Sequence, residues 1–239
     1  MAVVVRPDGS SAGQRRSGAR RWKPAGRVLG VGHVLGVLGS GDGLAQQTTD
    51  GLQVEAHVGL LDEAGVDRAV LFGTRPHPDR FVGFLSVPLG LGAEETAALV
   101  EREVLGRGLR GIGELAPAPG GAGLVEPVLR AAADQGRLPV VVHGSAPTTA
   151  ADLTTLATLA RRYPDVPLVV SQLGGQHWIQ AVELVRDTPN MYLELSTANV
   201  VFAVRTAVKE IPDRTLFSSD APYGEPVLGG TIAELIDLG

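Results

Sequence analysis

Short runs of β-branched and other apolar residues recur along the chain, and the stretches between them follow a helical pattern. Runs of four to six residues with this composition are typical of buried strands. Several of them, such as Val140-Val141-Val142, are apolar on both faces, as expected of parallel strands covered by helices. Eight strands are predicted, at residues 28–31, 68–72, 82–87, 109–114, 139–143, 167–171, 191–195 and 215–218.

The stretches between the predicted strands carry apolar residues at the spacing i, i+3, i+4 and i+7, which places them on one face of an α-helix. Three such stripes are Val125, Val128, Leu129 and Ala132; Leu153, Leu156, Ala157 and Ala160; and Trp178, Ala181, Val182 and Val185. Gly65 and Gly136 stand where two of the predicted helices end. Pro164, Pro189 and Pro212 each stop a helix just before a strand.

Strands that alternate with helices over 239 residues predict an α/β protein, and eight such units predict a closed (β/α)8 TIM barrel. A doubly wound open sheet is the alternative, and it usually carries a GxGxxG motif after its first strand. Here Gly30-Val31-Gly32 is followed by His33 and Val34, so the motif does not form. The last predicted helix, 231–238, is short, which leaves open a barrel that is truncated at its ends or sealed by a partner chain.

The composition narrows the chemistry that this chain can use. With 44% hydrophobic and 20% charged residues, it can bury a large core. It has no cysteine, so a metal would need histidine, carboxylate or carbonyl ligands. The apolar runs are too short to span a membrane, and the first residues lack the apolar core of a signal peptide. We therefore expect a cytoplasmic protein without a membrane partner.

Charge divides the chain into two parts. Residues 1–27 contain seven basic residues and one acidic residue, a net charge of +6 within a total of −5, so the remainder carries −11. A globular part this acidic argues against nucleic acid as a partner. We predict a basic, disordered arm over residues 1–26 and a barrel domain over residues 27–239. A nucleic-acid-binding tail or a targeting segment is the alternative for the arm.

Polar residues follow several of the predicted strands. His33, Glu114, His143, Gln172 and Asp220 each stand at or just after the carboxyl end of a strand, and in a parallel barrel all these ends lie at one mouth. Histidine and carboxylate side chains together favour a divalent metal, zinc most readily. Each residue also has a structural alternative: a strand cap for His143, an ion pair for Glu114, exposure to solvent for His33 and a turn cap for Asp220.

In this order and spacing, several segments of the chain resemble the amidohydrolase superfamily, in its amidohydrolase-related branch of metal-dependent hydrolases and decarboxylases. The resemblance covers nearly all of residues 28–239. It rests on residues 61–70, 110–114, 139–144, 171–175, 190–194 and 218–224.

The resemblance implies a role for each strand-end residue. The family has a His-x-His pair after the first strand, a histidine after the fifth, another after the sixth and an aspartate after the eighth. His143 then corresponds to the fifth-strand ligand, Asp220 to the catalytic carboxylate that touches the metal, and Glu114 to a carboxylate that bridges metals in some relatives. This chain departs from the pattern twice: only His33 follows the first strand, and Gln172 replaces the sixth-strand histidine.

The resemblance therefore implies a metal-dependent hydrolase that activates water for attack on an amide, ester or lactone carbonyl of a small-molecule substrate. The implied metal is zinc, with His33, Glu114, His143 and Asp220 as its ligands and Asp220 as the general base. Two alternatives stay open: a metal-assisted decarboxylase of the same branch, and a catalytically impaired barrel whose metal site has degraded. A homo-oligomer is also an open expectation.

Overall fold

The computed structural model describes residues 4–5, 32–33, 58–59, 61–62, 68–72, 78–196 and 200–218. Within them, one sheet has the order β1-β3-β4-β5-β6-β7-β8-β9, with β2 also paired to β3. Only β1 is antiparallel to its neighbour; the other pairings are parallel. The strands are β1 (Val4–Val5), β2 (Gly32–His33), β3 (Arg68–Phe72), β4 (Phe81–Leu85), β5 (Gly111–Leu115), β6 (Val140–Val142), β7 (Leu168–Val170), β8 (Met191–Glu194) and β9 (Thr215–Leu216).

Strands β3 to β9 coincide with seven of the predicted runs. The first predicted strand, at 28–31, lies outside the described residues, although β2 follows it directly. Most of the predicted arm, 1–26, also lies outside them; its described part, β1, pairs with β3.

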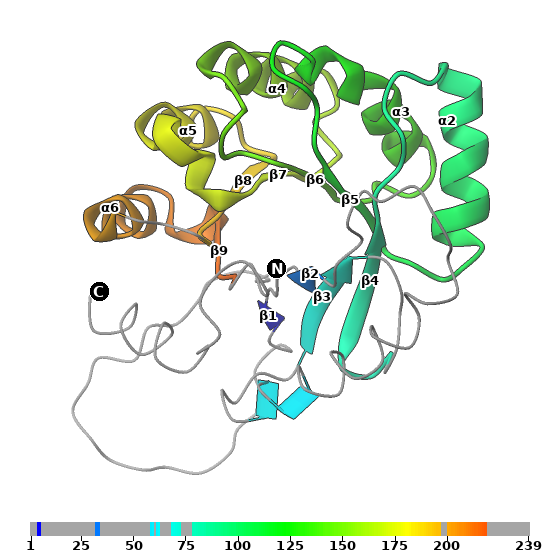
Figure 1. Cartoon of the computed structure of the whole chain (residues 1–239), viewed down its shortest axis with the longest axis horizontal. Coiled ribbons are helices and arrows are strands. Elements are labelled where there is room, and N and C mark those ends of the chain that lie inside the picture. The colour runs from blue at the N-terminus through cyan, green and yellow to red at the C-terminus, as the bar shows by residue number, and fades with distance from the viewer. Residues whose placement is uncertain are drawn as a thin grey trace.

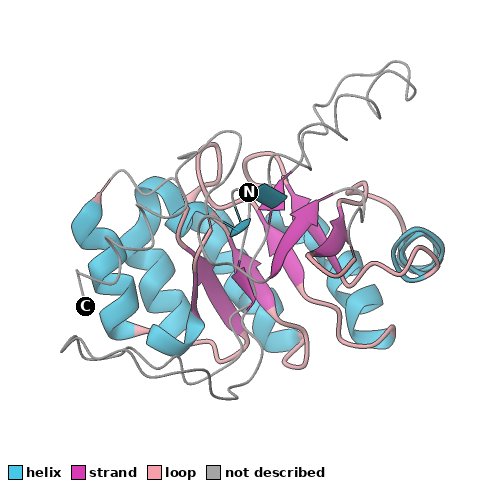
Figure 2. Cartoon of the chain, turned by 90° about the horizontal axis from the view of Figure 1, so that it is seen from below, coloured by secondary structure: helices cyan, strands magenta, loops and turns pink. Residues whose placement is uncertain are grey.

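The helices lie along the outer side of the curled sheet (Figures 1 and 2). Each strand from β4 to β8 is followed by helical residues that lead to the next strand, and this repetition makes the sheet parallel. The helices are α2 (Ala93–Leu99), which continues as the π-helical η1 (Val100–Leu105), α3 (Glu126–Asp134), α4 (Ala150–Arg162), α5 (Trp178–Arg186) and α6 (Val201–Glu210). Short 3-10 turns are η2 (Ala122–Val125), η3 (Gln172–His177) and η4 (Pro212–Arg214).

The sheet is buried on both faces. Val140 and Val142 of β6 pack into the larger core between the sheet and the helices. Val141, which lies between them, packs with Phe72 and Phe84 in a second cluster. Period-two alternation between two apolar environments explains why the strands read as continuous apolar runs.

The resulting architecture is a half-barrel of parallel βα units, the TIM-barrel arrangement that the sequence pattern predicts. The carboxyl ends of its parallel strands, β2 to β9, lie at one edge, so residues that follow different strands become neighbours. Within the described ranges, no helix is long and apolar enough to cross a lipid bilayer.

Candidate functional site

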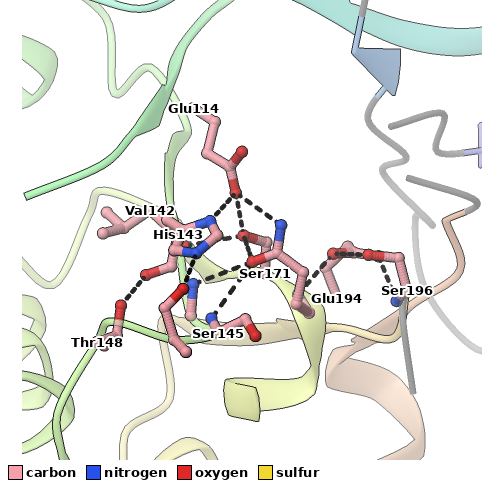
Figure 3. Close-up of polar contacts among 11 residues, drawn as sticks. Glu114, Val142, His143, Ser145, Thr148, Ser171, Glu194 and Ser196 are labelled. Atoms are coloured by element: carbon pink, nitrogen blue, oxygen red, sulfur yellow. Dashed lines mark hydrogen bonds and ion pairs between the residues drawn. The ribbon is translucent and has the colours of Figure 1, made fainter. Parts of the chain in front are cut away.

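Polar side chains from β5 and from the residues after β6 and β7 meet at the carboxyl edge of the sheet (Figure 3). Glu114 belongs to β5, His143 follows β6, and Ser171 and Gln172 follow β7. Of the sequence-predicted site residues, the structure thus brings Glu114 and His143 together, with Gln172 beside them.

One carboxylate oxygen, Oε1 of Glu114, is the centre of this group. Nδ1 of His143 lies 3.4 Å from it, and Nε2 of Gln172 donates to it at 3.2 Å. The hydroxyl of Ser171 also donates to it. The Glu114 side chain is only 10% exposed and that of His143 25%, so both groups face the mouth from largely buried positions.

A contact on the side away from Glu114 orients the imidazole ring of His143. Nε2 lies 3.1 Å from the carbonyl oxygen of Ala146. Since a carbonyl can only accept, Nε2 carries a hydrogen, and in the neutral tautomer the lone pair of Nδ1 then faces Glu114. A lone pair that faces a carboxylate is unfavourable, and a proton or a cation shared by the two atoms would relieve this repulsion. The carbonyl of His143 itself accepts from the hydroxyl of Thr148 at 3.0 Å, so Thr148 takes part of the capping role that the sequence suggested for His143.

The separation of Nδ1 and Oε1 also suits a metal ion. Two ligands of a tetrahedral zinc ion, each at roughly 2.0–2.2 Å from the metal, lie about 3.4 Å from one another. Metal-binding histidines commonly donate their other ring N–H to a backbone carbonyl, as His143 does to Ala146. Glu114 and His143 therefore have the separation and the donor chemistry of two zinc ligands.

The other two predicted ligands cannot be placed in the same detail. His33 is the last residue of β2, opposite Phe72 in the register with β3, which puts its backbone at the same edge; its side chain lies outside the described residues. Asp220 also lies outside them, two positions after Ser218. Among the described residues alone, no group of three or more histidine, aspartate and glutamate side chains could hold a metal ion.

A second carboxylate, Glu194, ends β8 and is fully buried. Its Oε2 accepts the backbone N–H of Gln172 at 2.9 Å and the hydroxyl of Ser196 at 2.9 Å, and its Oε1 accepts the N–H of Ser196 at 2.6 Å. Neither Glu194 nor Ser171 was among the predicted site residues. The signal was present, because Glu194 is a carboxylate at the end of an apolar strand, as Glu114 is.

Comparison with known families and structures gives this geometry a context. The sequence model of the family described as Amidohydrolase matches residues 42–229, most of the chain. Curated proteins include no significant match to the sequence.

Three solved structures show the same fold at low identity. An uncharacterized TIM-barrel protein from Bordetella bronchiseptica is 17% identical with a TM-score of 0.59, over 80% of this chain and 85% of that one. A 4-oxalomesaconate hydratase from Rhodopseudomonas palustris is 15% identical with a TM-score of 0.53, over 82% of each chain. A homocysteine methyltransferase from Escherichia coli is 12% identical with a TM-score of 0.55, over 87% of this chain and 95% of that one. A hydratase and a methyltransferase have similar TM-scores against this chain, so these structural similarities show the fold and not the reaction.

Proposed function

This chain belongs to the amidohydrolase family, and we propose that it is a metal-dependent hydrolase acting on an amide, ester or lactone of a small molecule. The observation that carries the proposal is the 3.4 Å separation of Glu114 Oε1 and His143 Nδ1 at the carboxyl edge of the sheet. We propose that Glu114 and His143 would hold a divalent metal, zinc, together with His33 and Asp220.

The proposed ligand set has two imidazoles and two carboxylates, a combination that suits zinc. Four ligands from different strands can bind one metal ion only if the carboxyl ends of those strands lie at the same edge of the sheet. β2 and β9 run parallel to their neighbours, and His33 and Asp220 stand at or beyond the ends of these strands. This topology supports His33 and Asp220 as ligands.

His143 and Asp220 have different roles in the proposed site. A zinc ion in such a site polarises a carbonyl group and acidifies water. The carbonyl oxygen of Ala146 accepts the hydrogen on Nε2 of His143, which leaves the lone pair of Nδ1 available to bind a metal. Asp220 would accept a proton as water oxygen bonds to the carbonyl carbon, and would pass it to the leaving oxygen or nitrogen as the bond to that carbon breaks, so that Asp220 ends the reaction unprotonated.

The proposal is tested by metal analysis of the purified full chain together with hydrolysis assays on amides, esters and lactones. We expect about one equivalent of zinc, activity that is lost on chelation and restored by zinc, and a decrease in kcat of roughly 10²–10⁴ for Asp220→Asn. The matched control is Asp213→Asn, which alters an exposed aspartate in η4. Absence of a bound divalent metal, with no stabilisation on adding zinc, would contradict the proposal.

A further inference from the structure

We infer that Gln172 is a positioning residue, whose side-chain amide holds the Glu114 carboxylate on one side and the loop after β6 on the other. In this way Oε1 of Glu114 stays directed at Nδ1 of His143. The inference rests on the proposed function only in treating these two atoms as metal ligands. It assigns a role to the residue that stands where the family pattern has its sixth-strand histidine.

The side-chain oxygen of Gln172 binds backbone. It accepts from the N–H groups of Gly144 and Ser145, each at 3.3 Å, and lies 3.1 Å from the hydroxyl of Ser171. The amide nitrogen instead donates to Glu114 at 3.2 Å. Turning the amide over would set NH₂ against two N–H donors and the oxygen against a carboxylate, so donor and acceptor chemistry permits one orientation.

This orientation removes Gln172 from the set of metal ligands. An amide ligand would have to use its oxygen, and that oxygen is already shared by Gly144 and Ser145. A histidine could not replace the bridge, because an imidazole offers at most one acceptor to the two backbone N–H groups. Gln172 therefore acts on the metal site through Glu114.

The backbone around Gln172 is built to aim this side chain. Gln172 and Leu173 have φ angles of 52° and 55°, in the left-handed region that non-glycine residues rarely adopt. Gly174 continues the left-handed turn with a φ angle of 73°, and Gly175, which also has a positive φ of 56°, leaves it with a ψ of −131°. The buried carboxylate of Glu194 accepts the N–H of Gln172 at 2.9 Å and so helps to hold this unfavourable conformation.

Two glycines let the loops after β6 and β7 approach backbone to backbone. A Cβ on Gly144 would lie 2.1 Å from the carbonyl oxygen of Ser171, and one on Gly175 would lie 2.7 Å from Cα of Ser145. Side chains at either position would force the loops apart. The close approach brings the N–H groups of Gly144 and Ser145 within reach of the Gln172 amide.

The test compares Gln172→Met, which keeps the length of the side chain and removes its hydrogen bonds, with the wild type. Gln180→Met is the matched control, because Gln180 also makes two amide hydrogen bonds, to Ala150 and Thr154, away from the site. Two quantities are measured: the affinity for zinc alone, by chelator competition, and the Glu114–His143 distance in crystals of the metal-free proteins.

We expect Gln172→Met to weaken zinc binding by roughly 10–100-fold, as is typical when the partner of a metal ligand is lost. In the metal-free crystal of this variant, the distance between Glu114 Oε1 and His143 Nδ1 should exceed about 4 Å, the limit for an ion pair. Gln180→Met should change neither quantity. If the wild type binds no zinc, the proposed function fails, while displacement of Glu114 in Gln172→Met would still support the positioning role. An unmoved Glu114, unchanged zinc affinity where the wild type binds zinc, or an equal effect in Gln180→Met would overturn the inference.

Discussion

The buried carboxylate of Glu194 on β8 accepts the backbone N–H of Gln172 after β7, at 2.9 Å. Gln172 in turn donates to Glu114 on β5 at 3.2 Å. Two carboxylates from different strands are therefore linked through one residue whose backbone is left-handed. Glu194 is fully buried, so we expect its hydrogen bonds to contribute to the stability of the fold as well as to the geometry of the site.

Glu194→Ala is expected to lower the free energy of unfolding by about 3 kcal/mol, because it leaves the N–H groups of Gln172 and Ser196 without their buried acceptor. Chemical denaturation measures the effect. Glu183→Ala, at an exposed position on α5, serves as the control and should stay within about 0.5 kcal/mol of the wild type. A similarly small effect for Glu194→Ala would show that the buried carboxylate does not hold the turn.

Gly144→Ala places a methyl group 2.1 Å from the backbone oxygen of Ser171, an overlap that only separation of the two loops can relieve. We expect a loss of roughly 1–3 kcal/mol in stability. Zinc affinity should fall with it, because the N–H of Gly144 leaves the Gln172 amide. Gly123→Ala, where a Cβ meets nothing within 4 Å, is the matched control and should leave both quantities unchanged. If the two variants behave alike, the loops are not in close contact.

Asp152 ties the start of α4 to the loop before α3. Its carboxylate accepts the N–H groups of Gly120 at 3.0 Å and Ala122 at 3.2 Å, and it forms a reciprocal capping box with Thr149. Burial by itself would raise the pKa of the Asp152 carboxyl, but the hydrogen bonds from Thr149, Gly120 and Ala122 outweigh it and hold that pKa below its usual value.

A lowered pKa means that the folded state binds the proton of Asp152 less readily than the unfolded state. The stabilisation is therefore complete above the unfolded value, about 3.9, and is lost as pH falls through the lower folded value. At neutral pH we expect Asp152→Asn to cost about 1–2 kcal/mol, and this difference from the wild type should shrink below about pH 4.

Urea unfolding of both proteins across pH measures this difference. The control is Asp134→Asn, an exposed aspartate at the end of α3. A cost for Asp152→Asn that does not change with pH would contradict the assignment.

The strands and helices from β3 to α6 could be predicted because burial is periodic in the sequence. Val140, Val141 and Val142 alternate between two cores, and such alternation between two apolar faces yields the continuous run that predicts a parallel strand. The meeting of Glu114 and His143 followed from a topological rule alone, since parallel strands end at one edge. No knowledge of side-chain contacts was needed for these predictions.

The role of Gln172 could not be predicted in the same way. It depends on the left-handed turn that begins at this residue, and on a partner, Glu114, that is 58 positions away in the chain. A sequence motif shows only that a histidine is missing. The turn and the two loops in contact decide that the glutamine bridges backbone and carboxylate. The role of Glu194 could not be predicted for the same reason, because its hydrogen-bond partner Gln172 lies 22 positions away in the chain.

Anomalous scattering from crystals grown with zinc tests most directly whether Glu114 and His143 would hold the same metal ion. We expect an anomalous peak, measured at the zinc absorption edge, at roughly 2.0–2.2 Å from both Glu114 Oε1 and His143 Nδ1. A map without a peak between these atoms, in which they keep their direct 3.4 Å contact in the presence of zinc, would contradict it.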